Sequence, residues 1–391
     1  MSRFLAGLGP NVLALAAASF FTDVASEMVF PLLPLFLTGT LKGSAAMLGL
    51  IEGAANALSS LLRIVSGWLA DRYRKHKLLV LVGYGLSVVA RPLFGAATLG
   101  WHVLAVRLVD RFGKGIRIAP RDALLAASCA PEARGKAFGF QKAMDHLGAA
   151  VGPVLATALL MRGWEVREVF YLTAVPAAVV LFVIGFFVRD PDGTAPPAPV
   201  KLTLRPFGPT FRGFLGTVAI FTLGTASDAF LILRAPECGV PLEFVPLLWS
   251  GVSLSRMLLA IPGGTLSDRF DRSRVILVGW LVHAGVFVAL AFTQTLWPFL
   301  ALLAAHALYY ALGESVLRAF VADLVPKELR GTAYGLYHFA IGLGSIPASL
   351  GFGLIWKYVG PRSAFLLAAG VALAASVAFA KIVVFRSKGG P

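Results

Sequence analysis

Residues 104–125, LAVRLVDRFGKGIRIAPRDALL, carry five cations at steps of three or four residues. These cations are Arg107, Arg111, Lys114, Arg117 and Arg121. In a helix, this spacing places all of them on one face, as a stripe about four turns long. A charge at bilayer depth costs roughly 2.5–3.5 kcal/mol on insertion scales and normally faces a protein interior or a water-filled cavity. Because the surrounding sequence is apolar, we expect these cations to line an aqueous path through a membrane protein.

The composition of the chain indicates an all-α membrane protein. Of its 391 residues, 58% are hydrophobic and 14% are charged, whereas soluble chains are about 45–50% apolar and about 25% charged. The apolar residues form blocks of about 20 residues, the length of a helix that crosses ~30 Å of hydrocarbon. The blocks lack the alternation of barrel strands, so their backbone polar groups must be satisfied within helices. No cleavage site follows the first block, and we expect no cleaved signal peptide.

We predict twelve transmembrane spans. They are residues 10–38, 44–66, 77–98, 101–124, 136–160, 168–188, 212–234, 244–266, 275–294, 297–320, 332–356 and 362–383. The net charge of +15 could indicate nucleic-acid binding. However, the cations gather in alternate loops, which is the pattern of cytoplasmic retention. We therefore expect no nucleic-acid partner, a location in the cytoplasmic membrane and both termini in the cytoplasm.

The two halves of the sequence repeat each other. GWLADRYRKHK at 67–77 matches GTLSDRFDRSR at 264–274, and ARGKAFGF at 133–140 matches LRGTAYGL at 329–336. The separation between matching residues is nearly constant. Parallel repeats of this kind form one transporter architecture, in which the substrate binds near the bilayer midplane between them.

A polar segment separates the repeats. Residues 189–210 are rich in Pro, Gly and Asp and suit an extended cytoplasmic linker. We therefore predict two pseudo-symmetric six-helix bundles, residues 1–188 and residues 211–391.

The loop after the second predicted span carries a motif, Gly67-x-Leu-Ala-Asp71-Arg72, which returns in the second half as Gly264-x-x-x-Asp268-Arg269. With this motif and its twelve spans, the chain resembles the major facilitator superfamily of transporters over essentially its whole length. In that family, acids at the ends of the second and fourth spans and a basic loop residue are thought to latch the outward-open state. The resemblance implies a cytoplasmic gate. Its residues here are Gly67, Asp71, Arg72, Arg74, Lys75, Asp122, Asp268 and Arg269.

Two further motifs resemble those of bacterial, proton-coupled efflux members of the family. Gly148, Gly152 and Pro153 on the fifth span are similar to the motif of exporters that exchange their substrate for protons. Arg107-Leu-Val-Asp110 resembles a fourth-span motif linked to proton handling, with Asp110 in place of Gln. The resemblance implies a proton-coupling role for Asp110.

Acidic residues also lie within the first span. Asp23 and Glu27 are one helical turn apart, and Asp228 repeats the position of Glu27 in the second half. Burial disfavours the charged form of a carboxyl group, which makes these three residues candidate proton carriers. The alternative is a structural pair bonded to an arginine of the fourth span.

Several polar residues inside the predicted spans are candidates for binding the substrate. Arg107 and Arg111 could neutralise the acids, bind an anionic substrate or satisfy the adjacent Asp110. The full set of candidates is Arg107, Arg111, Lys142, Asp145, His146, Arg256, His306 and His338.

The sequence favours a secondary transporter over an enzyme or a pump. It contains neither the G-x-x-x-x-G-K-[ST] loop of ATP-driven proteins nor a nucleophile elbow. We expect no cofactor, no resident metal and a monomer whose partners are the bilayer, protons and a small molecule. The predicted function is alternating-access efflux coupled to protons. The alternatives are an organic-anion transporter and a divalent-metal exporter with acidic and histidine ligands.

Overall fold

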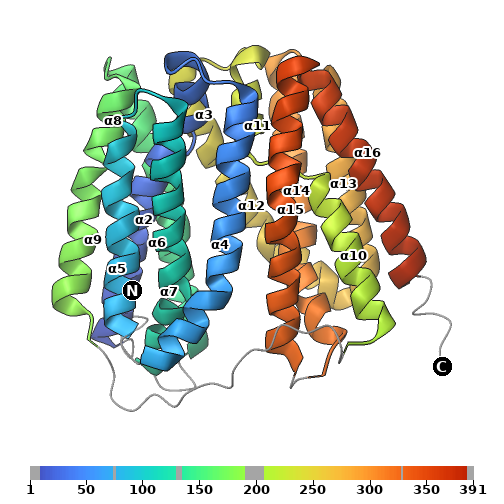
Figure 1. The fold of residues 1–391 in the computed structure, drawn as a ribbon, viewed down its shortest axis with the longest axis horizontal. Helices are drawn as coiled ribbons and strands as arrows, with labels where there is room; N and C mark the ends of the chain where they lie inside the picture. Colours follow the sequence, from blue (N-terminus) through green and yellow to red (C-terminus); the bar gives the residue numbers. More distant parts are fainter. Residues whose placement is uncertain (1–8, 74–75, 129–133, 190–206, 327–328, 385–391) are drawn as a thin grey trace. The chain divides into compact units, whose positions relative to one another are not determined.

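The computed structural model describes residues 9–73, 76–128, 134–189, 207–326 and 329–384 (Figure 1). Every regular element in these ranges is helical. The α-helices of the first half are α2 (Pro10–Val29), α3 (Leu33–Leu35), α4 (Ala45–Tyr73), α5 (His76–Ala90), α6 (Gly100–Ala127), α7 (Arg134–Met161), α8 (Val166–Leu172) and α9 (Ala174–Phe187). Those of the second half are α10 (Pro209–Leu223), α11 (Ala229–Arg234), α12 (Val245–Arg269), α13 (Arg272–Phe292), α14 (Leu296–Asp323), α15 (Arg330–Tyr358) and α16 (Pro361–Phe379). Short 3-10 helices cover Arg91–Phe94, Pro236–Cys238 and Leu242–Phe244, and π-helices cover Phe36–Thr40 and Ala380–Val384. Most of the predicted linker lies outside the described residues.

The helices confirm the predicted all-α membrane architecture. Among the described residues, ten helical segments are long and apolar enough to cross a membrane. They correspond to ten of the twelve predicted spans. The fourth predicted span is α6, which has sufficient length but carries the charged stripe. The seventh predicted span is divided between two helices.

The division of the seventh span corrects the prediction of one continuous helix over residues 212–234. Helix α10 ends at Leu223, and α11 begins only at Ala229, with Asp228 at its N-cap position. A close approach to α16 accompanies the break, because a Cβ atom on Gly224 would lie 2.6 Å from the backbone nitrogen of Ala372. Discontinuous helices are a common feature of transporter binding sites.

The chain forms two compact units. Unit 1 comprises residues 1–41, 58–199 and 243–250, and unit 2 comprises residues 42–57, 200–242 and 251–391. Each unit therefore contains most of one sequence half and a short segment of the other. Helix α4 passes from unit 2 to unit 1 at Leu58, and α12 passes from unit 1 to unit 2 at Gly251.

Each unit has its own apolar core. In unit 1, α2, α5, α6, α7 and α9 bury aliphatic side chains around Tyr84. In unit 2, α10, α13, α14, α15 and α16 bury a core with more aromatic residues. There Phe221 stacks on Trp280 with ring centroids 4.1 Å apart. Two separate cores allow each unit to hold a charged cluster in a fixed geometry.

A side-chain cap fixes the start of α13 in the loop that repeats the Asp-Arg motif. The Asp271 carboxylate accepts hydrogen bonds from the Arg274 backbone N–H at 3.1 Å and from the Ser273 hydroxyl. The Ser273 hydroxyl contributes most to lowering the pKa of Asp271, followed by the backbone donors. The cap satisfies a donor that the first turn of a helix leaves open.

Candidate functional site

The predicted acidic pair on α2 lies in the interior of unit 1. Asp23 and Glu27 are both partly buried. The charged groups that act on Asp23 electrostatically are Asp145, Lys114, Glu27 and Arg117. The Glu27 Oε2 atom accepts a hydrogen bond of 2.9 Å from the indole nitrogen of Trp249, whose ring lies 5.1 Å from that of Phe30. The structure thus brings the acids of α2 together with cations of α6 and an acid of α7.

The charged stripe of α6 faces the interior of unit 1, and the aqueous path that we expected along it stays a prediction. Arg107 and Arg117 are 2% and 4% exposed, whereas Val109 and Phe112 on the other side of the helix are 43% and 40% exposed. Arg111 and Lys114 are partly buried. The polar face of α6 is therefore inside unit 1 and its apolar face is outside. This is the arrangement expected of a charged helix in a membrane.

A buried ion pair connects three helices of unit 1. The Arg91 Nε atom lies 3.1 Å from the Asp110 carboxylate, and an Nη atom of Arg91 donates to the Thr22 carbonyl oxygen on α2 at 2.6 Å. Arg111 lies 3.8 Å from the second Asp110 oxygen. Asp110 was predicted from family resemblance, whereas Arg91 is a site residue that the sequence analysis missed. The sequence signal that could have indicated Arg91 is an arginine directly after an apolar helix, with no acidic residue close to it in sequence.

A second polar network connects α7 to α2 and α5. The Gln141 side-chain nitrogen donates to Asp145 at 2.8 Å and to the Ser19 hydroxyl at 3.0 Å, and Ser19 lies 3.2 Å from the Tyr84 hydroxyl. The Arg117 guanidinium lies over the Tyr84 ring at 4.3 Å. The network fixes the position of Asp145, which is one of the groups that act on Asp23.

Not all predicted residues of α7 belong to this buried cluster. The Lys142 side chain is 64% exposed and lies 3.8 Å from Asp145, whose side chain is 14% exposed. An ion pair so open to its surroundings contributes little energy. His146 is partly buried on the next turn of α7. The described contacts therefore support Asp145 more than Lys142 as a site residue.

The glycines of the predicted exporter motif allow α7 to approach α2 at the level of the acids. A Cβ atom on Gly148 would lie 2.4 Å from the Phe20 carbonyl oxygen, and one on Gly152 would lie 2.5 Å from the Val24 carbonyl oxygen. The added Cβ atom on Gly148 would also lie 3.1 Å from the Cβ atom of Asp23, and the one on Gly152 would lie 3.2 Å from the Cβ atom of Glu27. Pro153 lies inside α7 directly after this contact. Only glycine permits such a close contact with the backbone.

Unit 2 contains a separate charged cluster around Asp228. The two Asp228 oxygens accept hydrogen bonds of 2.9 Å and 3.0 Å from the two Nη atoms of Arg256. The Tyr310 hydroxyl donates to the same carboxylate at 3.2 Å, and the Arg256 guanidinium lies 3.7 Å from the centroid of the Tyr310 ring. Bidentate pairing of this kind is strong and fixes the orientation of both side chains. Asp228 and Arg256 were predicted separately, and the structure pairs them.

Two buried histidines lie beside this cluster. The ring centroids of His283 and His306 are 5.5 Å apart, and His306 is 5.4 Å from the Tyr310 ring. The Nε2 atom of His283 lies 3.3 Å from the Gly224 carbonyl oxygen at the end of α10. His306 was predicted, whereas His283 was missed because an isolated histidine in an apolar span gives no signal of its own. The other predicted histidine of unit 2, His338, packs against the Tyr337 ring on α15.

The predicted cytoplasmic gate is only partly covered by the described residues. Asp122 accepts hydrogen bonds from its neighbour Arg121 at 2.9 Å and 3.0 Å. The backbone is helical at Gly67, Asp71, Arg72, Asp268 and Arg269. The side chains of these five positions, and residues 74–75 entirely, lie outside the described part of the chain. The gate therefore stays a prediction.

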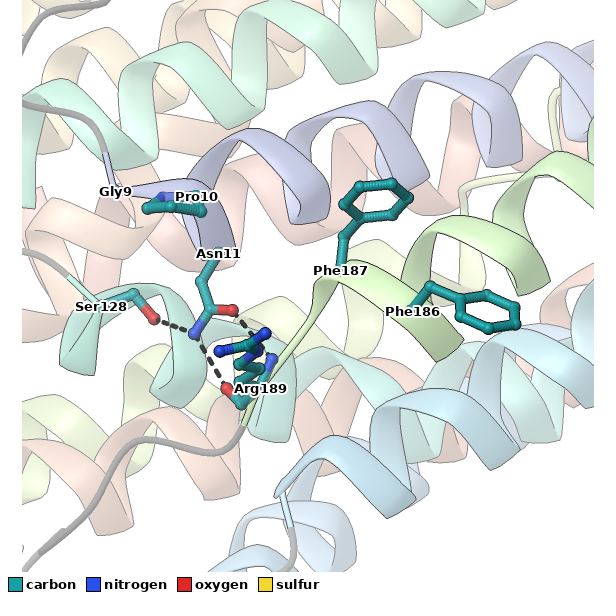
Figure 2. Close-up of a pocket in the computed structure, with 7 residues that line it drawn as sticks. All are labelled: Gly9, Pro10, Asn11, Ser128, Phe186, Phe187 and Arg189. Atoms are coloured by element: carbon teal, nitrogen blue, oxygen red, sulfur yellow. Dashed lines mark hydrogen bonds between the residues drawn. The ribbon is translucent and has the colours of Figure 1, made fainter.

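Unit 1 also has a pocket of about 430 Å³ where α2 begins and where α6 and α9 end (Figure 2). The Asn11 amide donates to the Ser128 hydroxyl at 3.0 Å and to the Arg189 carbonyl oxygen at 2.8 Å, and its oxygen accepts from the Arg189 backbone N–H at 2.9 Å. Phe186 and Phe187 line the other side (Figure 2). These contacts join helix ends, and none of the predicted site residues lines the pocket.

The helical units and their buried charges define a multi-pass membrane transporter. The chain belongs to the Major Facilitator Superfamily, whose sequence profile matches residues 15–247 and 213–390. This family consists of transporters and not of enzymes. Membership confirms the predicted family and transport class.

Individual relatives are similar over nearly the whole chain. The "Uncharacterized MFS-type transporter MJ1317" of Methanocaldococcus jannaschii is 31% identical, over 94% of this chain and 93% of its own. The multidrug resistance protein MdtG of Salmonella arizonae is 25% identical over 90% of both chains. A crystal structure of the nucleoside transporter NupG superposes with a TM-score of 0.81 over 95% of this chain and 99% of that chain, at 14% identity. The last likeness shows the fold alone.

Proposed function

We propose that the protein is a proton-coupled secondary transporter that exports a small organic compound by alternating access. The observation that carries this proposal is the group of carboxylates and cations inside unit 1. Asp23 and Glu27 on α2 are partly buried, and Lys114 and Arg117 of α6 act on Asp23 electrostatically. A buried carboxyl group with mobile charge partners can take up a proton when the partners move away.

In this proposal the α2 acids carry protons, and Arg107 and Arg111 tune them or compete with them for the substrate. Asp228 has the corresponding role in unit 2. Its bidentate partner Arg256 and the Tyr310 hydroxyl hold the carboxylate ionised until a proton or a substrate replaces them. The roles of the two clusters are thus parallel, as expected for repeated halves.

Two observations support the direction of transport. Gly148 and Gly152, through which α7 contacts α2, belong to the motif that is similar to that of proton-exchanging exporters. The relative MdtG carries the name of a multidrug resistance protein, which is consistent with efflux. The direction and the class of substrate are part of our proposal.

The excess of cations in unit 1 favours a second candidate, an organic-anion transporter. The cationic residues of the cluster are Arg91, Arg107, Arg111, Lys114 and Arg117, and the acidic residues are Asp23, Glu27, Asp110 and Asp145. An anion site depends on the geometry of Arg107, so Arg107→Lys should impair it, whereas Asp23→Asn should not. The divalent-metal alternative has no support from the described residues, where no three potential ligands among His, Cys, Asp and Glu converge.

The test measures proton movement in proteoliposomes that contain a pH-sensitive dye. A panel of organic cations, neutral compounds and organic anions is added to the purified protein at fixed pH. We expect one class to drive proton flux, and we expect Asp23→Asn and Glu27→Gln to abolish that flux. Glu237→Gln is the matched control because this acid lies at an exposed helix end and pairs with Arg234. Coupling in both α2 variants that equals that of the wild type would overturn the assignment of the carriers.

A further inference from the structure

The pocket of unit 1 lies at the ends of two candidate membrane spans (Figure 2). The span Pro10–Thr40 begins at a residue that lines the pocket, and the span Val166–Phe187 ends at another. The volume of about 430 Å³ is within the range of about 300–1,000 Å³ that ligand pockets occupy. The pocket therefore lies at the depth where the polar headgroups of a bilayer meet its hydrocarbon core.

One side of the pocket presents a fixed cation. The Asn11 amide holds both backbone groups of Arg189, whose side chain is exposed. No described residue forms an ion pair or a hydrogen bond with the Arg189 guanidinium. None of the described residues that line the pocket is acidic. The Arg189 guanidinium is thus available to an anionic group from outside the chain.

The helix ends around the pocket do not oppose an anion strongly. The C-terminal ends of α6 and α9 carry partial negative charge on their carbonyl groups. At the end of α6, the Ser128 hydroxyl donates to the Leu124 carbonyl oxygen at 2.7 Å. At the end of α9, the Lys77 ammonium donates to the Gly185 carbonyl oxygen at 2.9 Å. The lysine also adds a second positive charge at this end of α9.

An aromatic surface continues from the pocket along α9. Phe182, Phe186 and Phe187 are 55%, 73% and 56% exposed. The Phe182 ring centroid lies 5.0 Å from that of Phe186 and 5.8 Å from that of Phe187. Phe182 is one helical turn, ~6 Å, farther from Arg189 than Phe186 is. The cation and the apolar surface therefore follow each other in the order of a lipid headgroup and its acyl chain.

We propose that this pocket binds the anionic headgroup of a phospholipid, whose acyl chain lies along the three phenylalanines. Basic pockets between transmembrane helices are known to bind the headgroups of anionic lipids. The lipid site does not depend on the proposed transport function. Residues 1–8 and 190–206 adjoin lining residues in the sequence and lie outside the described part of the chain. Either segment is the alternative occupant.

The experiment titrates the detergent-purified full chain with phosphatidylglycerol or with phosphatidylcholine of identical acyl chains. Native mass spectrometry measures the Kd of the first bound lipid. Because the acyl chains are the same, the ratio of the two Kd values reports the contribution of the headgroup. We expect phosphatidylglycerol to bind about fivefold more tightly, the effect of one lysine or arginine near an anionic lipid.

Three variants separate the headgroup contact from the acyl-chain contact. Arg189→Ala should remove the preference for phosphatidylglycerol, and Arg189→Lys should keep it because the charge remains. Phe182→Ala should weaken both lipids alike and leave the ratio unchanged. The matched control is Arg162→Ala, which removes an exposed arginine between α7 and α8 and should change neither Kd.

The proposal is overturned if Arg189→Ala retains the preference of the parent protein, the result expected when a segment of the chain fills the pocket. It is also overturned if the parent binds both lipids equally. Glycerol 3-phosphate at the concentration of the lipid should not displace phosphatidylglycerol, because it lacks acyl chains. Displacement would instead assign the site to a small free anion. These titrations contain no transport substrate, so the proteoliposome test of proton flux is unaffected by their result.

Discussion

Asp110 is a buried acid of unit 1 with well-defined partners. It is 2% exposed, contacts Arg91 at 3.1 Å and Arg111 at 3.8 Å, and its backbone carbonyl accepts from the Ser87 hydroxyl at 2.8 Å. Family resemblance assigns it to proton handling, which stays a prediction. The contacts favour a structural function instead, because they connect α6 with α5 and, through Arg91, with α2.

We therefore predict that Asp110→Asn destabilises the fold. The variant leaves Arg91 buried beside a neutral group, and breaking a buried pair in this way costs about 3–5 kcal/mol. Thermal unfolding of the detergent-purified protein should show a clear decrease in Tm. Asp323→Asn is the matched control, because its pair with Arg272 is exposed and should contribute at most about 1 kcal/mol. An Asp110→Asn protein with an unchanged Tm and no proton flux would make Asp110 a proton carrier.

At the residue scale, the sequence indicates which side chains are buried charges but not how they pair. The spacing of Arg107, Asp110 and Arg117 predicts a shared buried face, and the structure places all three there. Their partners Arg91 and Tyr84 come from α5 and the turn that follows it. Such partners depend on the packing of neighbouring helices, which local spacing cannot specify.

At the scale of elements, hydropathy locates the helices well and their interruptions poorly. The apolar pattern continues through residues 212–234, yet the helix breaks after Leu223. Gly224, at the break, makes two contacts. It lies close to the backbone of Ala372, and its carbonyl oxygen is within hydrogen-bond distance of His283. Both partners lie far along the chain, so no local pattern could have predicted the break.

The α2–α7 contact yields a prediction at the same scale. Gly148→Ala and Gly152→Ala should each force these helices apart, because the added methyl group would meet backbone carbonyl oxygens of α2. Overpacking of this kind costs about 1–3 kcal/mol. We expect a lower Tm and reduced transport, since the displaced backbone carries Asp23 and Glu27.

Gly185→Ala on α9 is the matched control for these two variants. A Cβ atom there would have no neighbour within 4 Å, and replacing glycine by alanine inside a helix is favourable by roughly 0.5–1 kcal/mol. This variant should therefore keep or raise the Tm. If all three variants had the same Tm, the close α2–α7 contact would not matter for stability.

At the scale of the whole molecule, the sequence repeat and the compact units divide the chain differently. The repeat predicts a division at the linker, residues 189–210, whereas the units exchange residues 42–57 and 243–250 between the sequence halves. Hydrophobic periodicity shows that one face of a helix is buried. It does not show which neighbouring helix packs against that face. The glycine contacts of α4 with α15 show that a partner can come from the other half of the sequence.

The distribution of cations supplies the last prediction, which concerns the orientation of the whole chain. Lysine and arginine gather in alternate loops, and from this bias we predict that both termini lie in the cytoplasm. A membrane-impermeant thiol reagent applied to intact cells should therefore label Arg162→Cys, between α7 and α8, in a background without native cysteines. It should label Phe270→Cys, between α12 and α13, only after the membrane is permeabilised. Phe270 is 62% exposed, so lack of access to its side chain would not explain a failure to react. The reverse labelling pattern would invert the orientation and, with it, the assignment of the predicted gate to the cytoplasmic side.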